Sequence, residues 1–487
     1  MVMGDLPVET QLLVLGDGPG GYAAAFRAAD LGLDVTLVSN EARMGGICLL
    51  RGCIPSKALL HLAELAGGAR EAADMGLDFG LDEAGPRWDL ERVRDWTEGV
   101  VGKLSDGLAQ LCERRGIQRI RGRGAFAGPR RLLLSDSDYS SVEFEHAIIA
   151  TGSRPIAPPG IELRPGRQPS GRIMDSAGAL ALADIPPRLL VVGGGYVGLE
   201  LGSVYAAAGS RVTVIEMAER LLPGTDADLV RPLHDRLAER FESIRLGTRL
   251  EAADDDDDQV RVSLTTLDGD EQTSFDRVLI AIGRRPNSDD LGLEAAGVDT
   301  DGRGHIRVDA ERRTSARNIF AIGDVAGEPQ LAHKAMHEGR VAAGVIAGRP
   351  AAFDARAVPA VIYTDPQIAW CGLTEDQAEQ QGREVAISRF PWHASGRALT
   401  MGAADGLTKL VLDPGTGRVL GFGAVGRGAE GLVAEGMLAV EMGALAEDLA
   451  LGVHPHPSLS ETIGESAERF LGMPTHLAPG REPPRRG

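Results

Sequence analysis

The chain of 487 residues is too long for one hydrophobic core, so we expect about three domains. Its composition, 43% hydrophobic and 25% charged, is that of a water-soluble globular protein, and a formal net charge of −19 argues against nucleic acid as a partner. No apolar run reaches the roughly eighteen residues that span a bilayer, and the first ten residues lack a signal-peptide pattern, so we expect a cytoplasmic location and no membrane partner.

A nucleotide-binding pattern opens the chain. Residues 11–16 predict a buried strand, residues 22–31 a helix and residues 34–38 a second strand. The turn between strand and helix holds Gly16, Gly18, Pro19, Gly20 and Gly21. In this context the glycines let backbone N–H groups meet a pyrophosphate at the helix N-terminus. The position about 20 residues on, where an acid binds an adenosine ribose, is Ser39 here, with Glu41 close in sequence.

Two of the four cysteines, Cys48 and Cys53, lie within residues 45–57. In a reducing compartment a close pair is more often catalytic or metal-binding than structural, and no second pair supports zinc, so no metal is expected. Five residues of straight helix rise about 7.5 Å, beyond the roughly 7 Å between the Cα atoms of a disulfide. If the two cysteines pair, the helix must be distorted, and Gly52 suits that. The alternative is two buried free thiols, which is what we expect of Cys112 and Cys371.

The nucleotide-binding pattern recurs 177 residues further on, so the chain contains two such units. Residues 189–192 and 211–215 predict strands and residues 199–208 a helix. The turn holds Gly193, Gly195, Tyr196, Val197 and Gly198. Glu216 follows the second strand and favours NAD over NADP, because a carboxylate would repel a 2′-phosphate.

Strand ends at residues 150–155 and 281–287 predict crossings between domains, and residues 319–325 predict a strand that ends in Asp324. The acidic run at residues 254–258 predicts a solvated loop. After about residue 351 the nucleotide motifs stop. The predicted domains are a first nucleotide-binding domain in two parts (residues 1–155 and 281–350), a second nucleotide-binding domain (156–280), a third domain (351–473), to which the family resemblance described below assigns dimerisation, and a flexible tail (474–487).

The cysteine segment resembles the redox-active segment of the class I flavoprotein disulfide reductases, in which GGTCLNxGCIPSK is usual. Five further motifs match the same family, and the likeness runs from about residue 10 to residue 473. Within the family the chain is most similar to the dihydrolipoamide dehydrogenases, judged by Glu216 and by the ending HPHPSLSE. The motifs are ATG (150–152), AIGRRPN (281–287), IFAIGD (319–324), LAHKA (331–335) and PAVIYTDP (359–366).

The resemblance implies an α/β fold with two Rossmann-like dinucleotide-binding domains and a C-terminal α+β dimerisation domain. It implies FAD in the first unit and NAD in the second. FAD would be held by Gly16, Gly18, Pro19, Gly20, Gly21, Ser39, Lys57, Gly124, Thr151, Gly152, Gly323, Asp324, Leu331 and Ala332. NAD would be held by Gly193, Gly195, Tyr196, Val197, Gly198, Glu216, Gly283 and Arg284, and Tyr196 would cover the flavin until NAD arrives.

The resemblance also implies the catalytic roles. Cys53 would be the sulfur next to the flavin and Cys48 the sulfur that exchanges with substrate. Lys57 would lie by the flavin, paired with Glu200. His456 would be the general base, supplied by the partner subunit of a homodimer, and Glu461 would orient its ring.

This family resemblance implies oxidation of protein-bound dihydrolipoamide, with hydride passed to NAD⁺. The partners would be lipoyl domains of a 2-oxo acid dehydrogenase or glycine cleavage system. The alternatives are a glutathione-type or mercuric reductase, or a flavoprotein assembly subunit with little turnover. Glu216 argues against an NADP enzyme, the lack of a C-terminal cysteine pair against the mercuric type, and the complete catalytic set against a mere assembly subunit. The chain departs from the family pattern at Asp17, Ser39, Ile47 and Gln367.

Overall fold

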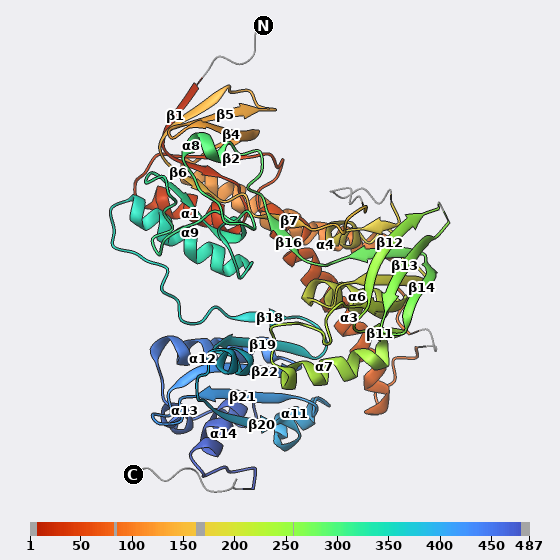
Figure 1. Cartoon of the computed structure of the whole chain (residues 1–487). Helices are drawn as coiled ribbons and strands as arrows, with labels where there is room; N and C mark the ends of the chain where they lie inside the picture. The colour runs from red at the N-terminus through yellow and green to blue at the C-terminus, as the bar shows by residue number, and fades with distance from the viewer. Residues whose placement is uncertain (1–6, 82–84, 162–170, 257, 479–487) are drawn as a thin grey trace.

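The first sheet of the computed structural model carries the first nucleotide-binding unit (Figure 1). The structure describes residues 7–81, 85–161, 171–256 and 258–478. The sheet consists of β1 (Pro7–Leu15), β2 (Val35–Ser39), β3 (Gln118–Arg121), β4 (Arg123–Gly128), β5 (Arg131–Ser135), β6 (Ser141–Ile149) and β17 (Ile319–Ala321). β1, β2, β3, β6 and β17 run parallel, whereas β4 and β5 form an antiparallel extension. The chain therefore returns to its first sheet after more than 150 residues, because β17 pairs with β6.

The second unit has its own parallel sheet in the order β11-β10-β9-β15-β8. Its strands are β8 (Ile173–Met174), β9 (Arg188–Val192), β10 (Arg211–Ile215), β11 (Ser243–Arg245) and β15 (Arg277–Ile280). An antiparallel sheet of β12 (Arg249–Asp255), β13 (Val260–Thr266) and β14 (Gly269–Phe275) lies beside it. The prediction of a loop is wrong for the first two residues of the acidic run, Asp254 and Asp255. Asp254 pairs in register with Arg261 of β13, so the hairpin draws these acids into a strand.

A third, antiparallel sheet closes the C-terminal part of the chain, in the order β18-β19-β22-β21-β20. Its strands are β18 (Ala360–Ile362), β19 (Gln367–Gly372), β20 (Ala386–Pro391), β21 (Leu407–Leu412) and β22 (Val419–Gly426), and it packs against α12 (Ala429–Met442) and α14 (Glu461–Phe470). Two parallel nucleotide-binding sheets and an α+β C-terminal part confirm the predicted fold class. The boundaries between the domains stay predictions.

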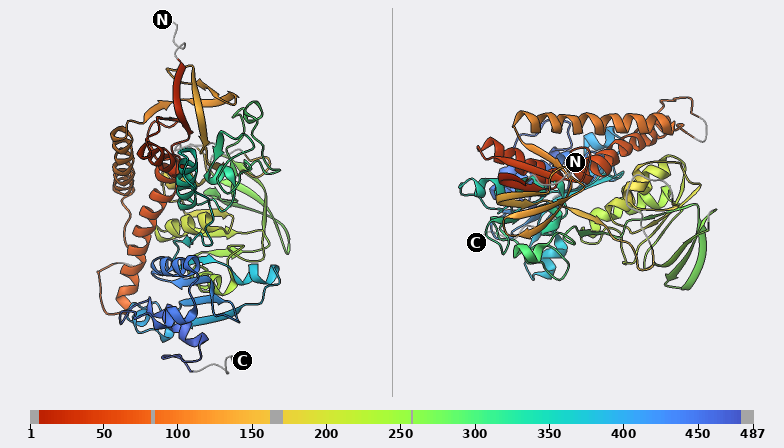
Figure 2. Two further views of the ribbon diagram at one scale, coloured as in Figure 1. Left: turned by 90° about the vertical axis from the view of Figure 1, so that its left-hand side faces the viewer. Right: turned by 90° about the horizontal axis from the view of Figure 1, so that it is seen from above.

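The helices of the nucleotide units begin earlier than predicted. The helices are α1 (Pro19–Asp30), α2 (Gly46–Arg51), α3 (Cys53–Asp74), α4 (Leu90–Arg114), α5 (Ser176–Leu180), α6 (Tyr196–Ala207), α7 (Ala227–Arg240), α8 (Leu293–Ala296) and α9 (Ala332–Ile346). Proline suits the first position of α1 because its missing N–H has no partner there. Gly21 fits in the first turn only because it lacks a Cβ, which would lie 1.9 Å from the Gly16 oxygen. Figure 2 shows the long helices α3 and α4 side by side.

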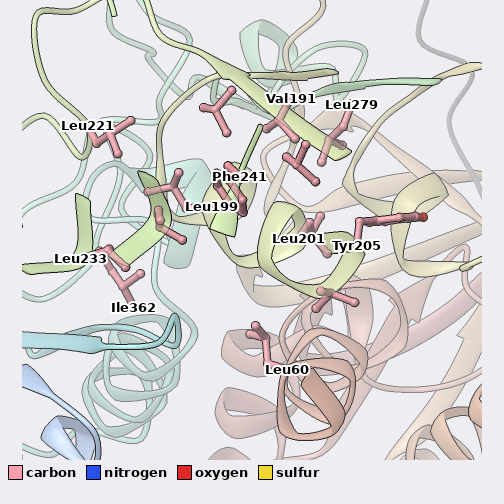
Figure 3. Packing of buried hydrophobic residues seen from close by; sticks show 14 of the residues in the cluster. Leu60, Val191, Leu199, Leu201, Tyr205, Leu221, Leu233, Phe241, Leu279 and Ile362 are labelled. Atoms are coloured by element: carbon pink, nitrogen blue, oxygen red, sulfur yellow. The ribbon is translucent and has the colours of Figure 1, made fainter. Parts of the chain in front are cut away.

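Hydrophobic packing joins α3, the second unit and the C-terminal sheet (Figure 3). Leu60 of α3 lies under α6, where it faces Leu201 and Tyr205. On the other side of the same cluster Leu233 of α7 meets Ile362 of β18. Because one apolar cluster spans these elements, the cysteine-bearing helix is packed directly against the second nucleotide-binding unit.

One stretch of the described residues, Gly46–Asp74, is long and apolar enough on average to cross a membrane. Only the length and composition of this stretch suggest a membrane span. The chain leaves helical geometry at Gly52, which divides the stretch into α2 and α3. Leu59 and Leu60 are buried in the shared core, and Lys57 pairs with a carboxylate of α6. These are the contacts of an interior helix of a globular domain.

Part of the predicted tail is attached to α14. The His476 ring lies 2.5 Å from the Glu465 carboxylate, and Thr475 donates a hydrogen bond to Glu468. The flexibility of the tail stays a prediction, although the side chains of Thr475 and His476 find partners on the preceding helix. Residues 479–487 lie outside the described residues.

An ammonium group connects the second unit to the C-terminal sheet. Lys409 of β21 is 1% exposed, and its Nζ lies 2.6 Å from Asp226, 2.7 Å from Asp228 and 2.7 Å from Glu375. Burial alone would lower the pKa of Lys409, but the carboxylates raise it above its ordinary value, so the ammonium stays charged. The three acids are spaced like metal ligands, and Lys409 lies where a cation would be held.

Lys409→Met is expected to lower the free energy of unfolding by about 3 kcal/mol, because it leaves partly buried carboxylates without this cation. Arg389 still pairs with Asp228 and Glu375, which limits the loss. Calorimetric unfolding measures the effect. Lys103→Met, the same change at an exposed lysine of α4, is the matched control and should have the same free energy of unfolding as the native protein. Equal effects of the two substitutions would contradict this role of Lys409.

Candidate active site

Cys48 and Cys53 form a disulfide across the junction of α2 and α3. Their Cα atoms are 4.8 Å apart, closer than five residues of straight helix allow. The chain leaves helical geometry at Gly52, with φ −144° and ψ −111°. A Cβ at Gly52 would lie 3.0 Å from the Ile47 oxygen and 3.2 Å from the Cys48 Cα, so the close approach requires glycine. The predicted pairing and the predicted helix distortion are both confirmed.

The disulfide lines a pocket of about 1040 Å³ between the first sheet, the cysteine helices and α6. Lys57, Glu200 and Tyr196 line it together with the two cysteines. The pocket also brings together thirteen further residues that were predicted to contact the nucleotides, drawn from segments far apart in the chain. Predicted contacts among them are Gly16, Gly18, Pro19, Gly20, Ser39, Gly124, Thr151, Gly152, Val197, Arg284, Gly323, Asp324 and Ala332. Outside the lining are Gly21, Leu331, Gly193, Gly195, Gly198, Glu216, Gly283, His456 and Glu461.

The first glycine turn has the shape of a phosphate cradle. Gly16 has φ +110°, and a Cβ on it would lie 2.3 Å from the Ala150 oxygen. At Gly18 a Cβ would meet nothing closer than 3.9 Å, so this backbone is open to the pocket at the N-terminus of α1. The cradle and a pocket of this volume fit FAD, which would lie with its pyrophosphate at the turn.

Hydrogen bonds connect the strand-end motifs to one another beside the turn. The Ser153 hydroxyl donates to the Asp324 carboxylate at 2.5 Å and accepts from Arg284 Nε at 2.7 Å. Thr151 and Asn287 exchange two hydrogen bonds, at 2.7 and 2.9 Å. The short strands β7 (Ser153–Pro155) and β16 (Arg284–Pro286), which carry Ser153 and Arg284, pair with each other. These contacts therefore join the two predicted domain crossings, residues 150–155 and 281–287, to each other at the wall of the pocket.

A charged pair lies one helical turn beyond the disulfide. Lys57 Nζ is 2.8 Å from Glu200 Oε2, as predicted. The Glu200 side chain is 4% exposed, and it also accepts from the Ser56 hydroxyl at 3.1 Å and the Tyr363 amide at 3.0 Å. The Lys57 ammonium lies 4.5 Å from the centre of the Tyr363 ring. Glu200 therefore fixes the ammonium where it can stabilise negative charge near the dithiol.

Lys57→Met is expected to slow reduction of bound FAD by a dithiol about a hundredfold, because the positive charge beside the reacting groups is lost. Lys57→Arg keeps the charge and should retain more of the rate. Stopped-flow absorbance of the flavin measures the step, with FAD content determined for each preparation. Equal rates in Lys57→Met and the native protein at equal FAD content would refute the role.

The second glycine turn is built like the first. Gly193 has φ +111°, and a Cβ on Gly195 would meet no atom within 4 Å, so its backbone is open at the N-terminus of α6. The Glu216 carboxylate accepts from the amides of Gly194 at 2.7 Å and Ala218 at 2.8 Å. A fixed carboxylate at this place suits the ribose of NAD. Tyr196, the first residue of α6, connects this turn with the pocket.

The predicted base and its partner are in contact. His456 Nδ1 lies 2.8 Å from Glu461 Oε1, and the other oxygen of Glu461 accepts from the Ser458 amide at 2.6 Å. Burial acts to raise the pKa of Glu461, but the Ser458 amide and His456 hold it below its usual value. His454 pairs instead with Glu435. The His456 side chain is 73% exposed and lies outside the pocket lining, so within one chain it does not face the disulfide.

The other two cysteines are separate buried thiols, as predicted. Burial raises the pKa of Cys112 above its ordinary value and that of Cys371 to about 12. Cys112 lies in α4 and Cys371 in β19. Protonated, buried thiols are poor nucleophiles, so reactivity is confined to the Cys48–Cys53 pair.

Two dinucleotide-binding folds and a disulfide in the pocket beside them define a nucleotide-linked disulfide oxidoreductase. Residues 10–339 match the pyridine nucleotide-disulphide oxidoreductase family, and residues 358–467 match the dimerisation domain of that family. The chain belongs to this family. It is therefore an oxidoreductase with FAD and NAD(H) as cofactors, and its C-terminal part is a dimerisation domain.

Curated relatives cover nearly the whole chain. The dihydrolipoyl dehydrogenase of Vibrio parahaemolyticus is 44% identical over 472 residues, 96% of this chain and 97% of the relative. That of Halobacterium salinarum is 46% identical over 482 residues, 98% and 99% of the two chains. Among solved structures, LpdA from Mycobacterium tuberculosis matches with a TM-score of 0.85 at 28% identity, over 94% of this chain and 99% of LpdA. The HOCl-induced flavoprotein disulfide reductase RclA from Escherichia coli matches with 0.80 at 28%, over 93% and 98%.

Proposed function

We propose that the chain is a dihydrolipoyl dehydrogenase, which oxidises protein-bound dihydrolipoamide and reduces NAD⁺. The single observation that carries this proposal is the Cys48–Cys53 disulfide in the pocket that fits FAD. The near full-length likeness to dihydrolipoyl dehydrogenases supports the choice of dithiol. Glu216, held at the second turn, supports NAD as the acceptor.

In the proposed reaction His456 takes a proton from one substrate thiol, and Glu461 stabilises the resulting imidazolium. The substrate thiolate attacks Cys48 Sγ, the Cys48–Cys53 bond breaks, and Cys53 leaves as a thiolate. The second substrate thiol then displaces Cys48, so oxidised lipoamide departs and the two electrons remain in the Cys48–Cys53 dithiol. FAD, when bound, supplies the hydride chemistry that carries these electrons to NAD⁺.

The proposed assembly is a homodimer in the cytoplasm. Its dihydrolipoamide substrate would be carried by the lipoyl domains of a 2-oxo acid dehydrogenase or glycine cleavage system. Apolar side chains of the C-terminal part support the dimer, because they are too exposed for a lone chain. They come from α12, α13 (Ala446–Leu451) and the segment that follows. The most exposed are Leu438 (57%), Met442 (75%), Leu451 (73%) and Val453 (100%).

Steady-state assays with dihydrolipoamide and NAD⁺, and with lipoamide, glutathione disulfide and mercuric ion as acceptors for NADH and NADPH, test the proposal. The lipoyl substrates with NAD(H) should give the highest kcat/KM by at least about tenfold. A preference for glutathione disulfide or mercuric ion would reassign the substrate. Negligible turnover of every pair, in protein that contains FAD, would favour the assembly-subunit alternative.

A further inference from the structure

The two nucleotide-binding units of this chain differ at one pair of positions. The same offset of 177 residues that relates Gly16 to Gly193 also relates Asp17 to Gly194 and Ser39 to Glu216. Each unit thus has one carboxylate and one small residue, but the two are exchanged. In the second unit the acid follows the second strand, whereas in the first unit it lies inside the glycine turn.

The second unit shows that these two positions share one space. A Cβ on Gly194 would lie 2.6 Å from the Leu221 Cδ2, and 3.1 Å from the Cβ and 3.2 Å from the Cγ of Glu216. The Glu216 side chain turns back over the glycine turn and accepts a hydrogen bond from the Gly194 amide. A side chain at the turn and a long side chain at the strand end would therefore compete for the same volume. An acid at either position places its carboxylate near the same point.

In the first unit Asp17 fills this space. Asp17 is 2% exposed and lines the pocket beside Ser39. The Ser39 hydroxyl accepts from the Glu41 amide at 3.2 Å, and a hydrogen bond of the same hydroxyl to Asp17 acts to lower the pKa of that carboxyl. Glu41 itself is turned away and binds Arg51 through both oxygens, so it does not replace the missing strand-end acid.

One oxygen of Asp17, Oδ2, is buried without a hydrogen-bond partner in the described residues. A buried carboxylate oxygen without a donor is costly, and a donor is therefore expected from whatever fills the pocket. A ribose presents two adjacent hydroxyl donors, the chemistry for which an acid is used in such units.

We propose that Asp17, with Ser39 beside it, accepts hydrogen bonds from the adenosine ribose hydroxyls of FAD, and so replaces the acid that the end of β2 lacks. The assignment rests on the proposed placement of FAD in the first unit. It makes Asp17 a binding residue rather than a charge that opposes the pyrophosphate.

Protonation gives this site a pH dependence. Burial raises the pKa of Asp17 to about 6, while the Ser39 hydroxyl and Arg119 of β3 act to lower it and Glu41 acts to raise it. Arg51 of α2 and the protonated thiol of Cys112 are the other titratable groups near the carboxyl. Above pH 6 the carboxylate is a charged acceptor, and below pH 6 it is protonated and accepts more weakly. FAD should therefore be held less tightly as the pH falls through 6.

Release of FAD from the holoenzyme, followed by flavin fluorescence on dilution, tests the proposal without an activity assay. Asp17→Ala and Asp17→Asn are expected to raise the Kd for FAD by about 10- to 100-fold, the effect of losing hydrogen bonds to a charged acceptor. The double variant Asp17→Gly with Ser39→Glu rebuilds the pattern of the second unit and should return the Kd to within a few fold of native. Ser39→Glu alone should weaken binding, because two carboxylates then share one space.

An FAD analogue that lacks the adenosine 2′-hydroxyl identifies the contact. The native protein should bind FAD more tightly than the analogue, and Asp17→Ala should lose that preference. The Kd for NAD, which uses the second unit, should stay unchanged in all variants and reports intact folding. Asp17→Ala that binds FAD as tightly as the native protein, or more tightly, overturns the inference. Native protein that binds no FAD overturns the proposed function as well.

Discussion

Replacing Cys48 by serine is expected to reduce dithiol-dependent reduction of NAD⁺ at least about a thousandfold, because a hydroxyl can neither form the enzyme disulfide nor exchange with a thiol. The loss should be confined to the dithiol half of the reaction. NADH oxidation by ferricyanide needs only the flavin, so it should continue in Cys48→Ser at a rate within a few fold of native.

Cys112→Ser is the matched control for this prediction. Cys112 is a buried thiol of α4 that donates only a weak hydrogen bond to the Ile117 oxygen, and serine can make the same bond. Cys112 is buried in a hydrophobic cluster and does not line the pocket that contains the disulfide, so Cys112→Ser should keep its dithiol activity. If Cys48→Ser were as active as Cys112→Ser, the redox role of the disulfide would be excluded.

The two cysteines can also be distinguished from each other. In the proposed order Cys53 lies next to the flavin, so Cys48→Ser leaves a lone Cys53 thiolate beside the oxidised ring. Such a preparation should show a long-wavelength absorbance band without any reductant, which should vanish as acid protonates the thiolate. Cys53→Ser should lack the band. The opposite pattern would reverse the order of the two sulfurs.

Spacing, together with the family resemblance, was enough to predict the local parts of the site. Cysteines five residues apart cannot bond in a straight helix, so the break at Gly52 followed from helix geometry. Glu461, five positions after His456, is the first residue of α14 and reaches back to the His456 ring, whereas His454 pairs with Glu435. Lys57, which the family resemblance assigned to the flavin, is one of only four lysines in the chain. These signals need no knowledge of the tertiary fold.

Two of the other three lysines have structural roles that were not predicted from the sequence. Lys334 and Lys409 are, like Lys57, paired with acids, Lys334 with Glu338 and Lys409 with acids of α7 and α10 (Glu375–Gln380). Their partners could not be predicted because the Lys409 contact joins residues more than 180 positions apart, on elements that meet only in the folded chain.

The direction of individual side chains is the second property that could not be predicted from the sequence. Glu41 could have served the ribose or pointed elsewhere, and only the structure places it on Arg51. Arg51 and Ser56 line the pocket yet were not predicted, although both lie inside the cysteine segment. A helix projected from Cys53 would have placed Ser56, three residues on, on the same face as Cys53. No comparable pattern exists for Arg51, whose position depends on the break at Gly52.

The second large effect concerns His456. His456→Ala is expected to slow dithiol oxidation about 10²- to 10⁴-fold, the usual contribution of a general base, and to leave ferricyanide reduction by NADH unaffected. Glu461, whose pKa is held below its usual value, stays ionised at neutral pH and keeps orienting the ring. Glu461→Gln removes the charge but not the shape, so it should be less damaging. His454→Ala, two residues away, is the matched control.

Mixed dimers decide where His456 acts. Within one chain the ring is exposed and outside the pocket that contains the disulfide, and α14 lies at the opposite end of the molecule from the first sheet (Figure 1). If the base comes from the partner subunit, a dimer of one Cys48→Ser chain and one His456→Ala chain contains one complete site. Such a dimer, isolated through two different affinity tags, should have about half the native activity per dimer, although each homodimer is nearly inactive.

The complementary dimer reverses this expectation. A chain with both Cys48→Ser and His456→Ala, paired with a native chain, has no complete site if the base acts across the interface, because each site then lacks one group. It would keep about half the native activity if each chain used its own His456. The two heterodimers contain the same four side chains at these positions, so their folding and FAD content should match, and the difference in activity reports only the path from base to dithiol. Activity in the second dimer rather than the first would show that the exposed ring must swing into its own pocket.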